Sequence, residues 1–333
     1  MPFMFGDFLD RGVFVKARFW GTRGSLPAAA DTLDVRAKLV EALMASRGHV
    51  FRNERDIDDF VDRELPFTGR GYYGTNTACV QIEGGTEYVL CDAGTGIRDF
   101  SNHLAAGDNA GDTDGRPKLF NIFLSHLHWD HIQGFPFFMP AYAEGSRIVV
   151  HGCHPGMRSA FSYQQEHADI PLTLRADISY EMLEPGWEYD IAGFHVRTIT
   201  QNHPGDSFGY RFEKAGKSIV YSTDCEHFED SAGDDYRFLD FFRDADLLII
   251  DAQYELGAAG LAKENWGHSS NIVAVELGVR SGVRRLCLFH NEPTIDDAAL
   301  TGFLEGTRRY RTLYDEGSGM TVDLAYDGLE INI

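Results

Sequence analysis

Residues 119–134 read LFNIFLSHLHWDHIQG, an apolar run that gives way at once to a loop crowded with polar side chains. Three histidines and one aspartate fall within six positions of that loop: His126, His128, Asp130 and His131. The apolar run predicts a buried strand, so these side chains stand at a strand end, where open α/β sheets place their ligands. A histidine-rich turn without function is one interpretation of the loop, and a metal site is the other.

The same arrangement recurs at three later points in the chain. His203 follows the strand-like run FHVRTIT, Asp224 follows KSIVYST, and His290 follows RRLCLF. Taken singly, a histidine after a strand is usually a packing residue, and an aspartate there is a turn or helix-cap residue. Seven such residues at strand ends, four of them in one HxHxDH pattern, favour a metal site.

The spacing inside the loop agrees with metal chemistry. His126 and His128 are two positions apart, so in extended backbone they project to one side and can chelate one ion. Asp130 and His131 can serve a second ion, and a carboxylate such as Asp224 can bridge the two. Imidazole and carboxylate donors without cysteine suit zinc, and manganese or iron also fit. In two-metal sites the ions lie about 3.5–4 Å apart and share a water of lowered pKa.

Composition limits the class of protein. The 333 residues carry a net charge of −21 and are 43% hydrophobic, which supports a packed core and opposes binding to a polyphosphate backbone. The five cysteines are widely spaced without a CxxC pair, so we expect reduced thiols. Neither a signal-peptide pattern nor an apolar run of bilayer length is present, so we expect a cytoplasmic protein with no membrane partner.

The order of the predicted elements indicates the fold class. Strands precede helices in both halves and nothing marks a linker, so residues 1–333 are expected to form a single α/β domain of the αββα type, with two sheets between helical layers. Two β-rich runs about Gly84 and Gly85 predict a hairpin. Helices are expected at 156–168, 270–281 and near 295–315, and the composition of residues 105–117 predicts an exposed loop.

Residues 28–66 differ from the rest of the chain. They are rich in charged residues and have apolar residues at helical spacing, such as Val35, Leu39, Val40 and Leu43. This pattern predicts a helical insertion within the domain, which either caps the site or contacts another molecule. A homodimer is one form that such a contact can take.

With these residues in place, the chain resembles the metallo-β-lactamase superfamily over the stretch from RFWGTRGS to LFHNEP. The resemblance implies an αββα fold and two metal ions, expected to be Zn²⁺, with Mn²⁺ or Fe²⁺ as alternatives. It also implies that Asp224 bridges the ions. The remaining ligands would divide into one set of His126, His128 and His203 and a second set of Asp130, His131 and His290.

A second group of residues points to a branch of that superfamily. Asp92, in DAGTG, is expected to orient a metal-bound histidine, although a plain turn residue is as good an interpretation. The segment WGHSS at 266–270 resembles the His-Ser-Thr segment of RNase Z and of cyclic nucleotide phosphodiesterases. The resemblance makes His268 a phosphate-binding and proton-donating residue, with Ser269 beside it, while Ser269 or Ser270 can equally cap the next helix.

The predicted reaction is therefore metal-assisted hydrolysis of a phosphodiester, with His268 and Asp130 as catalytic residues. Residues 141–200 contain four arginines, no lysine and eight acidic residues, so no basic arm for tRNA is visible there. A small phosphodiester, above all a cyclic nucleotide, is favoured as substrate, and a nucleic-acid polymer is disfavoured. Three alternatives stay open: a lactonase or thioesterase of the same superfamily, RNase Z-like RNA processing, and a non-enzymatic protein that keeps the metal-stabilised fold.

Overall fold

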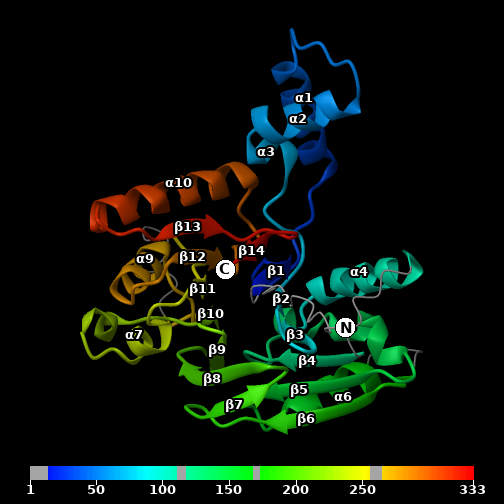
Figure 1. The fold of residues 1–333 in the computed structure, drawn as a ribbon, viewed down its shortest axis with the longest axis vertical. Coiled ribbons are helices and arrows are strands. Elements are labelled where there is room, and N and C mark those ends of the chain that lie inside the picture. Colours follow the sequence, from blue (N-terminus) through cyan, green and yellow to red (C-terminus); the bar gives the residue numbers. More distant parts are fainter. Residues whose placement is uncertain (1–13, 111–117, 168–172, 256–264) are drawn as a thin grey trace, which may run out of the picture.

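The strands form two separate sheets, and the C-terminal strand returns to the sheet that contains the N-terminal one (Figure 1). The structure, a computed structural model, describes residues 14–110, 118–167, 173–255 and 265–333, and within them each sheet has seven strands. The first sheet has the order β14 (Glu330–Asn332), β1 (Lys16–Gly21), β2 (Cys79–Glu83), β3 (Tyr88–Cys91), β4 (Leu119–Phe123), β5 (Arg147–Gly152) and β6 (Asp177–Met182). The second has the order β13 (Thr321–Leu324), β12 (Arg285–Phe289), β11 (Leu247–Asp251), β10 (Lys217–Ser222), β9 (Ser207–Lys214), β8 (Phe194–Gln201) and β7 (Glu188–Ile191).

Both sheets contain a block of parallel strands that ends at the candidate site. Strands β3 to β6 are parallel in the first sheet, and β10 to β13 are parallel in the second. The predicted hairpin is confirmed, because β2 and β3 pair antiparallel with Val80 opposite Cys91. Parallel strands are buried on both faces, so their sequences are continuous apolar runs. LFNIF in β4 and LLIID in β11 are two such runs, and both predict strands from the sequence alone.

Helices cover the outer faces of the sheets (Figure 1). The first sheet packs against α4 (Gly96–Ala110) and α6 (Met157–His167), and the second against α7 (Arg237–Phe242), α9 (Asn271–Arg280) and α10 (Asp297–Tyr314). One apolar cluster lies between the sheets, and two more lie between each sheet and its helices. Three apolar layers between four structural layers confirm the predicted αββα architecture. Short helical turns complete the connections: α5 (Trp129–Ile132), η1 (Phe135–Phe137), η2 (Met139–Tyr142) and η3 (Glu229–Ala232).

The prediction of an exposed loop over 105–117 is wrong for its first part. Helix α4 continues to Ala110, and residues 111–117 lie outside the described part of the chain. The helix is held by an apolar face that includes Ile97 and Phe100, which are fully buried, so packing outweighs the glycine and aspartate content that suggested a loop. Strands β6, β13 and β14 were not predicted either; β14 has only three residues, and β6 has no buried residue.

Residues 28–66 hold α1 (Thr32–Ala45) and α2 (Glu54–Glu64), and the short α3 (Phe67–Arg70) follows. These helices stand away from both sheets (Figure 1). Their description as an insertion within one domain of residues 1–333 stays a prediction. In the part of the chain that the structure describes, no helix combines the length and the apolarity that crossing a bilayer requires.

Candidate metal centre

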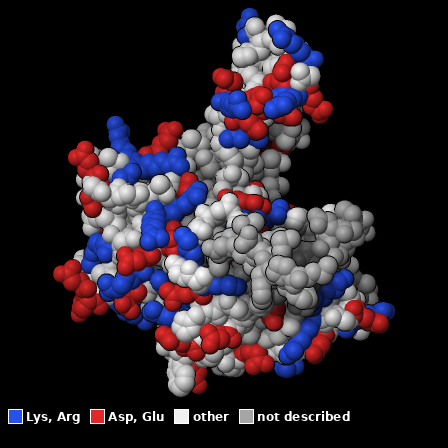
Figure 2. Space-filling view, viewed as in Figure 1, with Lys and Arg blue, Asp and Glu red and all other residues white. Residues whose placement is uncertain are grey.

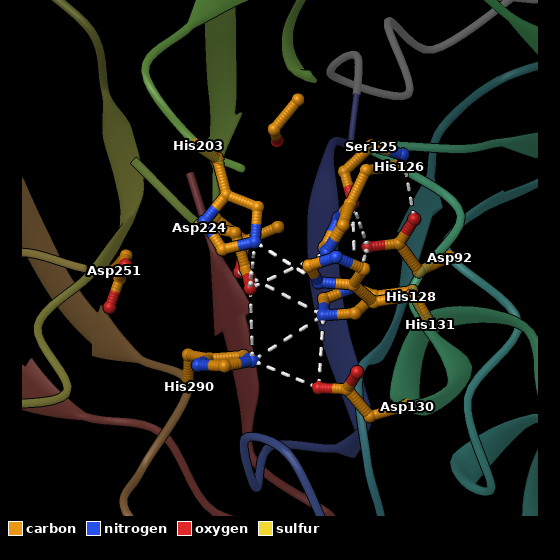
Figure 3. A network of polar contacts seen from close by, with 12 residues as sticks. Asp92, Ser125, His126, His128, Asp130, His131, His203, Asp224, Asp251 and His290 are labelled. Atoms are coloured by element: carbon orange, nitrogen blue, oxygen red, sulfur yellow. Dashed lines mark hydrogen bonds and ion pairs between the residues drawn. The ribbon is translucent and has the colours of Figure 1, made fainter. Parts of the chain in front are cut away.

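Four strand ends bring the seven predicted ligands to one place (Figure 3). The loop after β4 carries four of them, and β8, β10 and β12 contribute His203, Asp224 and His290. The contact between His290 Nε2 and Asp130 Oδ2 spans 3.2 Å in space and 160 residues in sequence. Strands β4, β10 and β12 lie in the parallel blocks, and β8 runs in the same direction as β10 because both pair antiparallel with β9. Their carboxyl ends, and the ligands that follow them, therefore meet at one edge.

The candidate ligand atoms fall into five overlapping groups, and two of these have the composition expected from the sequence. The atoms of His126, His128 and His203 lie within 4.8 Å of one another, and those of Asp130, His131 and His290 do the same. Three further groups overlap these two: His126 with His131 and Asp224, His203 with Asp224 and His268, and Asp251 with His268 and His290. These residues form a largely buried cluster of imidazoles and carboxylates that can hold metal ions, with His128 at its exposed side.

Asp224 lies between the two sets of ligands (Figure 3). Its carboxylate oxygens are 3.6 Å from His126 Nε2, 3.4 Å from His131 Nε2, 3.8 Å from His203 Nε2 and 3.4 Å from His290 Nε2. Burial alone would raise the pKa of this carboxyl group, but the surrounding imidazoles, above all His290 and His131, hold it well below its ordinary value. Asp224 is thus an anion placed where a bridging ligand would have to be.

The residues fit a metal ion on electrostatic grounds. Burial lowers the pKa of His126, His128 and His203, so these imidazoles are neutral, as a metal ligand must be. His126 Nε2 is completely buried and has no hydrogen-bond partner. A buried imidazole nitrogen with a free lone pair, beside two buried carboxylates, is an arrangement that a cation stabilises.

Asp92 lies where the sequence placed it, behind a histidine of the cluster. Its Oδ2 is 2.7 Å from His131 Nδ1 and also accepts hydrogen bonds from the Ser125 and Tyr221 hydroxyls, at 2.8 and 2.7 Å. The Ser125 backbone N–H donates to the other Asp92 oxygen at 2.7 Å. A carboxylate held by so many donors fixes the ring of His131 and directs its Nε2 towards the cluster.

Three residues of the site have backbone conformations that are unusual for side chains with a Cβ. The φ angles are 61° for Asp92, 50° for Asp224 and 63° for His290. Each such residue costs of order 1 kcal/mol and persists only where its surroundings over-determine it. All three come at the end of a strand, where the turn swings the side chain into the cluster.

His268 lies at the edge of the cluster, on the segment that leads into α9. Its Nδ1–H donates to Asp251 Oδ2 at 2.8 Å, and its ring stacks on that of His290 with centroids 4.9 Å apart. Burial would lower the pKa of His268, but the Asp251 carboxylate raises it to about 9. A histidine in this position can hold a proton at neutral pH.

The two serines after His268 have separate roles in the structure. The Ser269 hydroxyl donates to Cys225 O at 2.7 Å and accepts from His227 N–H at 3.0 Å. Ser270 caps α9 by accepting from Val273 N–H, which confirms one of the two caps considered from the sequence. The expected contact of Ser269 with a substrate stays a prediction, and its hydroxyl already has two backbone partners.

Sequence reasoning missed Asp251, Tyr221 and Glu226. Asp251 ends the apolar run LLIID, so its position at a strand end was a usable signal. Tyr221 is a fully buried strand residue whose hydroxyl finds Asp92 across 129 residues, and nothing local marks it. Glu226 accepts from the backbone N–H groups of Asn265 and Gly267, both at 2.9 Å, and so ties down the segment that carries His268.

Comparisons with known proteins agree with this geometry. The family described as "Beta-lactamase superfamily domain" matches residues 87–291, which include all seven predicted ligands. Ribonuclease Z of Picrophilus torridus is 25% identical over 230 residues, covering 54% of this chain and 71% of that protein. Ribonuclease Z of Thermoplasma acidophilum is 25% identical over 235 residues, covering 57% and 74%.

Solved structures show the same fold at low sequence identity. The metallo-β-lactamase fold protein YhfI from Bacillus subtilis has a TM-score of 0.61 at 16% identity, covering 97% of this chain and 100% of that one. Yeast PDE1 has a TM-score of 0.60 at 11% identity, with 97% and 100% covered. The short form of human tRNase Z has a TM-score of 0.58 at 18% identity, with 95% and 98% covered. The family match together with the buried histidine and aspartate cluster identifies this chain as a metal-dependent hydrolase of the metallo-β-lactamase superfamily.

Proposed function

We propose that this hydrolase is a binuclear phosphodiesterase that cleaves a small phosphodiester, and that this substrate is a cyclic nucleotide. The observation that carries the proposal is the position of His268, which is tied to Asp251 and borders both halves of the ligand cluster. A phosphodiester brings a negative charge to the site before any reaction, and a protonated His268 is placed to bind it, whereas a neutral ester becomes negative only in the transition state.

The proposal assigns the two expected sets of three ligands to two Zn²⁺ ions, with Asp224 shared between them; Mn²⁺ or Fe²⁺ would suit the same donors. When bound, such ions polarise phosphoryl oxygens and lower the pKa of a water. Asp92 orients His131, and Gly267 O accepts from His203 Nδ1–H at 2.8 Å, so both rings are held in one tautomer.

The catalytic residues in this proposal are His268 and Asp130. Water adds to phosphorus and loses a proton to solvent, the bond from phosphorus to the ester oxygen breaks, and His268 gives its proton to the departing oxygen and is reprotonated from solvent. Asp130 Oδ2 accepts from Ser25 N–H at 2.8 Å and lies 3.2 Å from His290 Nε2, so its position is fixed, and the proposal gives it the role of holding the attacking water. The role of Ser269 in binding the phosphate is part of the same proposal, and its test is loss of substrate affinity in Ser269→Ala.

The experiment is a substrate panel with measured metal content. Purified protein with its metal quantified would be assayed on bis-p-nitrophenyl phosphate, on cyclic mono- and dinucleotides, and on lactones and thioesters. We expect two equivalents of transition metal, diesterase activity that a chelator abolishes, and at least a tenfold preference for one cyclic nucleotide. Metal-replete protein that cleaves lactones or thioesters but no diester would overturn the proposal.

A second candidate function is RNA 3′ processing, because the curated relatives cited above are ribonucleases Z. The net charge of −21 opposes it, since a chain of that charge repels a polyphosphate backbone. A precursor tRNA with a 3′ trailer belongs in the same panel. Trailer removal at low enzyme concentration, with cyclic nucleotides left intact, would favour this second function.

A further inference from the structure

Arg23 is a buried arginine in the segment that follows β1. Of the lysines and arginines that the structure describes, only Arg23 and Arg211 are buried. Figure 2 shows, for one face of the molecule, how the other basic side chains lie at the surface. The exposed fraction of Arg23 is 0%. Burying a cation costs free energy unless the group is well hydrogen-bonded, so we looked for the reason in the contacts of this residue.

The guanidinium of Arg23 binds the loop that follows the candidate metal ligand His290. Its Nη1 donates to Glu292 O at 2.8 Å and to Ile295 O at 3.2 Å. Its Nε donates to Gly74 O at 2.9 Å. A planar guanidinium suits this role, because its donors point in fixed directions and can hold several acceptors at once.

The backbone that follows this arginine contacts two candidate metal ligands. A Cβ on Gly24 would lie 2.4 Å from His290 Nδ1, so the Gly24 backbone lies directly against that imidazole. Gly24 N–H also donates to Asn291 O at 2.9 Å. Ser25 N–H donates to Asp130 Oδ2 at 2.8 Å. The φ of Ser25 is 59°, a conformation that persists in a residue with a Cβ only where its surroundings require it.

These contacts reach only one of the two expected sets of ligands. Asp130 and His290 belong to the second set, with His131. The first set is held from another segment, because Gly267 O accepts from His203 Nδ1–H at 2.8 Å. The two sets therefore depend on different parts of the chain, and residues 23–25 support the second.

We propose that Arg23 is a positioning residue for the second set of ligands, which it holds through the loop after His290 and through its neighbours Gly24 and Ser25. The inference rests on the two ions of the proposed function. The sign of the effect separates positioning from simple electrostatics. Removing a positive charge would by itself strengthen the binding of a cation nearby, whereas loss of positioning weakens it.

The test is the affinity of each set for Co²⁺, whose visible absorption depends on its ligands. The metal-free full chain would be titrated with Co²⁺, and His290→Ala and His203→Ala would supply the reference spectra of the first and the second set alone. Arg23→Met should bind the ion of the second set about 10–100-fold more weakly and the other ion with unchanged affinity. With one equivalent of Co²⁺ its spectrum should match that of His290→Ala.

Arg211→Met is the matched control. Arg211 is the other buried arginine, and it also donates to two backbone carbonyls, Phe241 O at 3.1 Å and Arg243 O at 3.0 Å. These carbonyls lie at the end of α7 and not beside a candidate ligand. Arg211→Met should lower the midpoint of denaturation and leave both Co²⁺ affinities unchanged.

Arg23→Lys is a second variant that remains informative if Arg23→Met does not fold. It keeps the positive charge but not the fork of donors, so it should weaken the second set by a smaller factor. A wild-type protein that binds fewer than two ions would contradict the proposed function and this inference with it. Two ions in the wild type, with the second set unchanged or strengthened in the Arg23 variants, or with both sets weakened equally, would overturn this inference alone.

Discussion

His268 is the residue whose removal should separate chemistry from metal binding. Because the proposal assigns it no metal, His268→Ala is expected to lower turnover by about 10²–10⁴-fold while two equivalents of metal remain. The measurements are kcat on bis-p-nitrophenyl phosphate and metal content by elemental analysis. His195→Ala, at a partly exposed histidine of β8, is the control. Unaltered turnover in His268→Ala would remove the residue from the mechanism.

Gly267 is a second single residue on which the site depends. It has a φ of +87°, and a Cβ there would lie 2.1 Å from His203 Nδ1. Gly267→Ala should therefore displace His203 and reduce metal content below two equivalents, together with activity.

Gly216 provides the matched control for that substitution. Its φ is +76° and a Cβ would meet nothing within 4 Å, so Gly216→Ala carries the backbone strain without the collision. It should cost about 1 kcal/mol of stability and leave the metal in place. If both alanine variants lost metal equally, the collision with His203 would not be the cause.

At the scale of elements, a residue that follows β10, Glu226, holds residues 265–267, which lie between β11 and α9. Glu226 is almost fully buried, and both its oxygens accept backbone N–H groups of that segment, at Asn265 and Gly267. In Glu226→Gln an NH₂ group replaces one carboxylate oxygen, so one of the two backbone N–H groups loses its acceptor and faces a donor instead. Because Gly267 O in turn orients His203, we expect metal affinity to fall about tenfold, measured by titration with a chromophoric chelator.

The control for Glu226→Gln is the same change at Glu330. That carboxylate lies in a half-exposed ion pair with Lys16 on β1, and exposed pairs contribute less than about 1 kcal/mol. Glu330→Gln should leave metal affinity unchanged. Equal affinities in the two variants would show that the anchoring of the 265–267 segment does not reach the metal ligands.

At the scale of the whole molecule, buried neutral histidines should make the fold sensitive to acid. Burial lowers the pKa of His151 to about 4 and that of His227 to about 3. In the unfolded chain each imidazole takes up a proton below about pH 6.5, whereas in the folded chain it stays neutral. The free energy of unfolding is therefore highest above pH 6.5 and decreases as the pH falls towards 4. For His151 the loss amounts to about 3 kcal/mol.

This pH dependence can be assigned to one residue by comparison. The free energy of unfolding would be measured in denaturant at several pH values between 7.5 and 5. His151→Gln, which can still bond to Asn121 Oδ1, should lose stability less steeply than the wild type as the pH falls. Parallel curves for the two proteins would contradict the assignment.

The sequence alone determined the fold class, the seven candidate ligands and the orienting role suggested for Asp92. These signals are local, because an apolar run that ends in a histidine or an aspartate can be recognised in the sequence without knowledge of its tertiary contacts. The tertiary structure decided how these pieces combine. It paired His268 with Asp251, bonded Tyr221 to Asp92 and left α1 without a buried side chain. Such contacts depend on strand order and helix rotation, and these follow from packing between residues far apart in the chain.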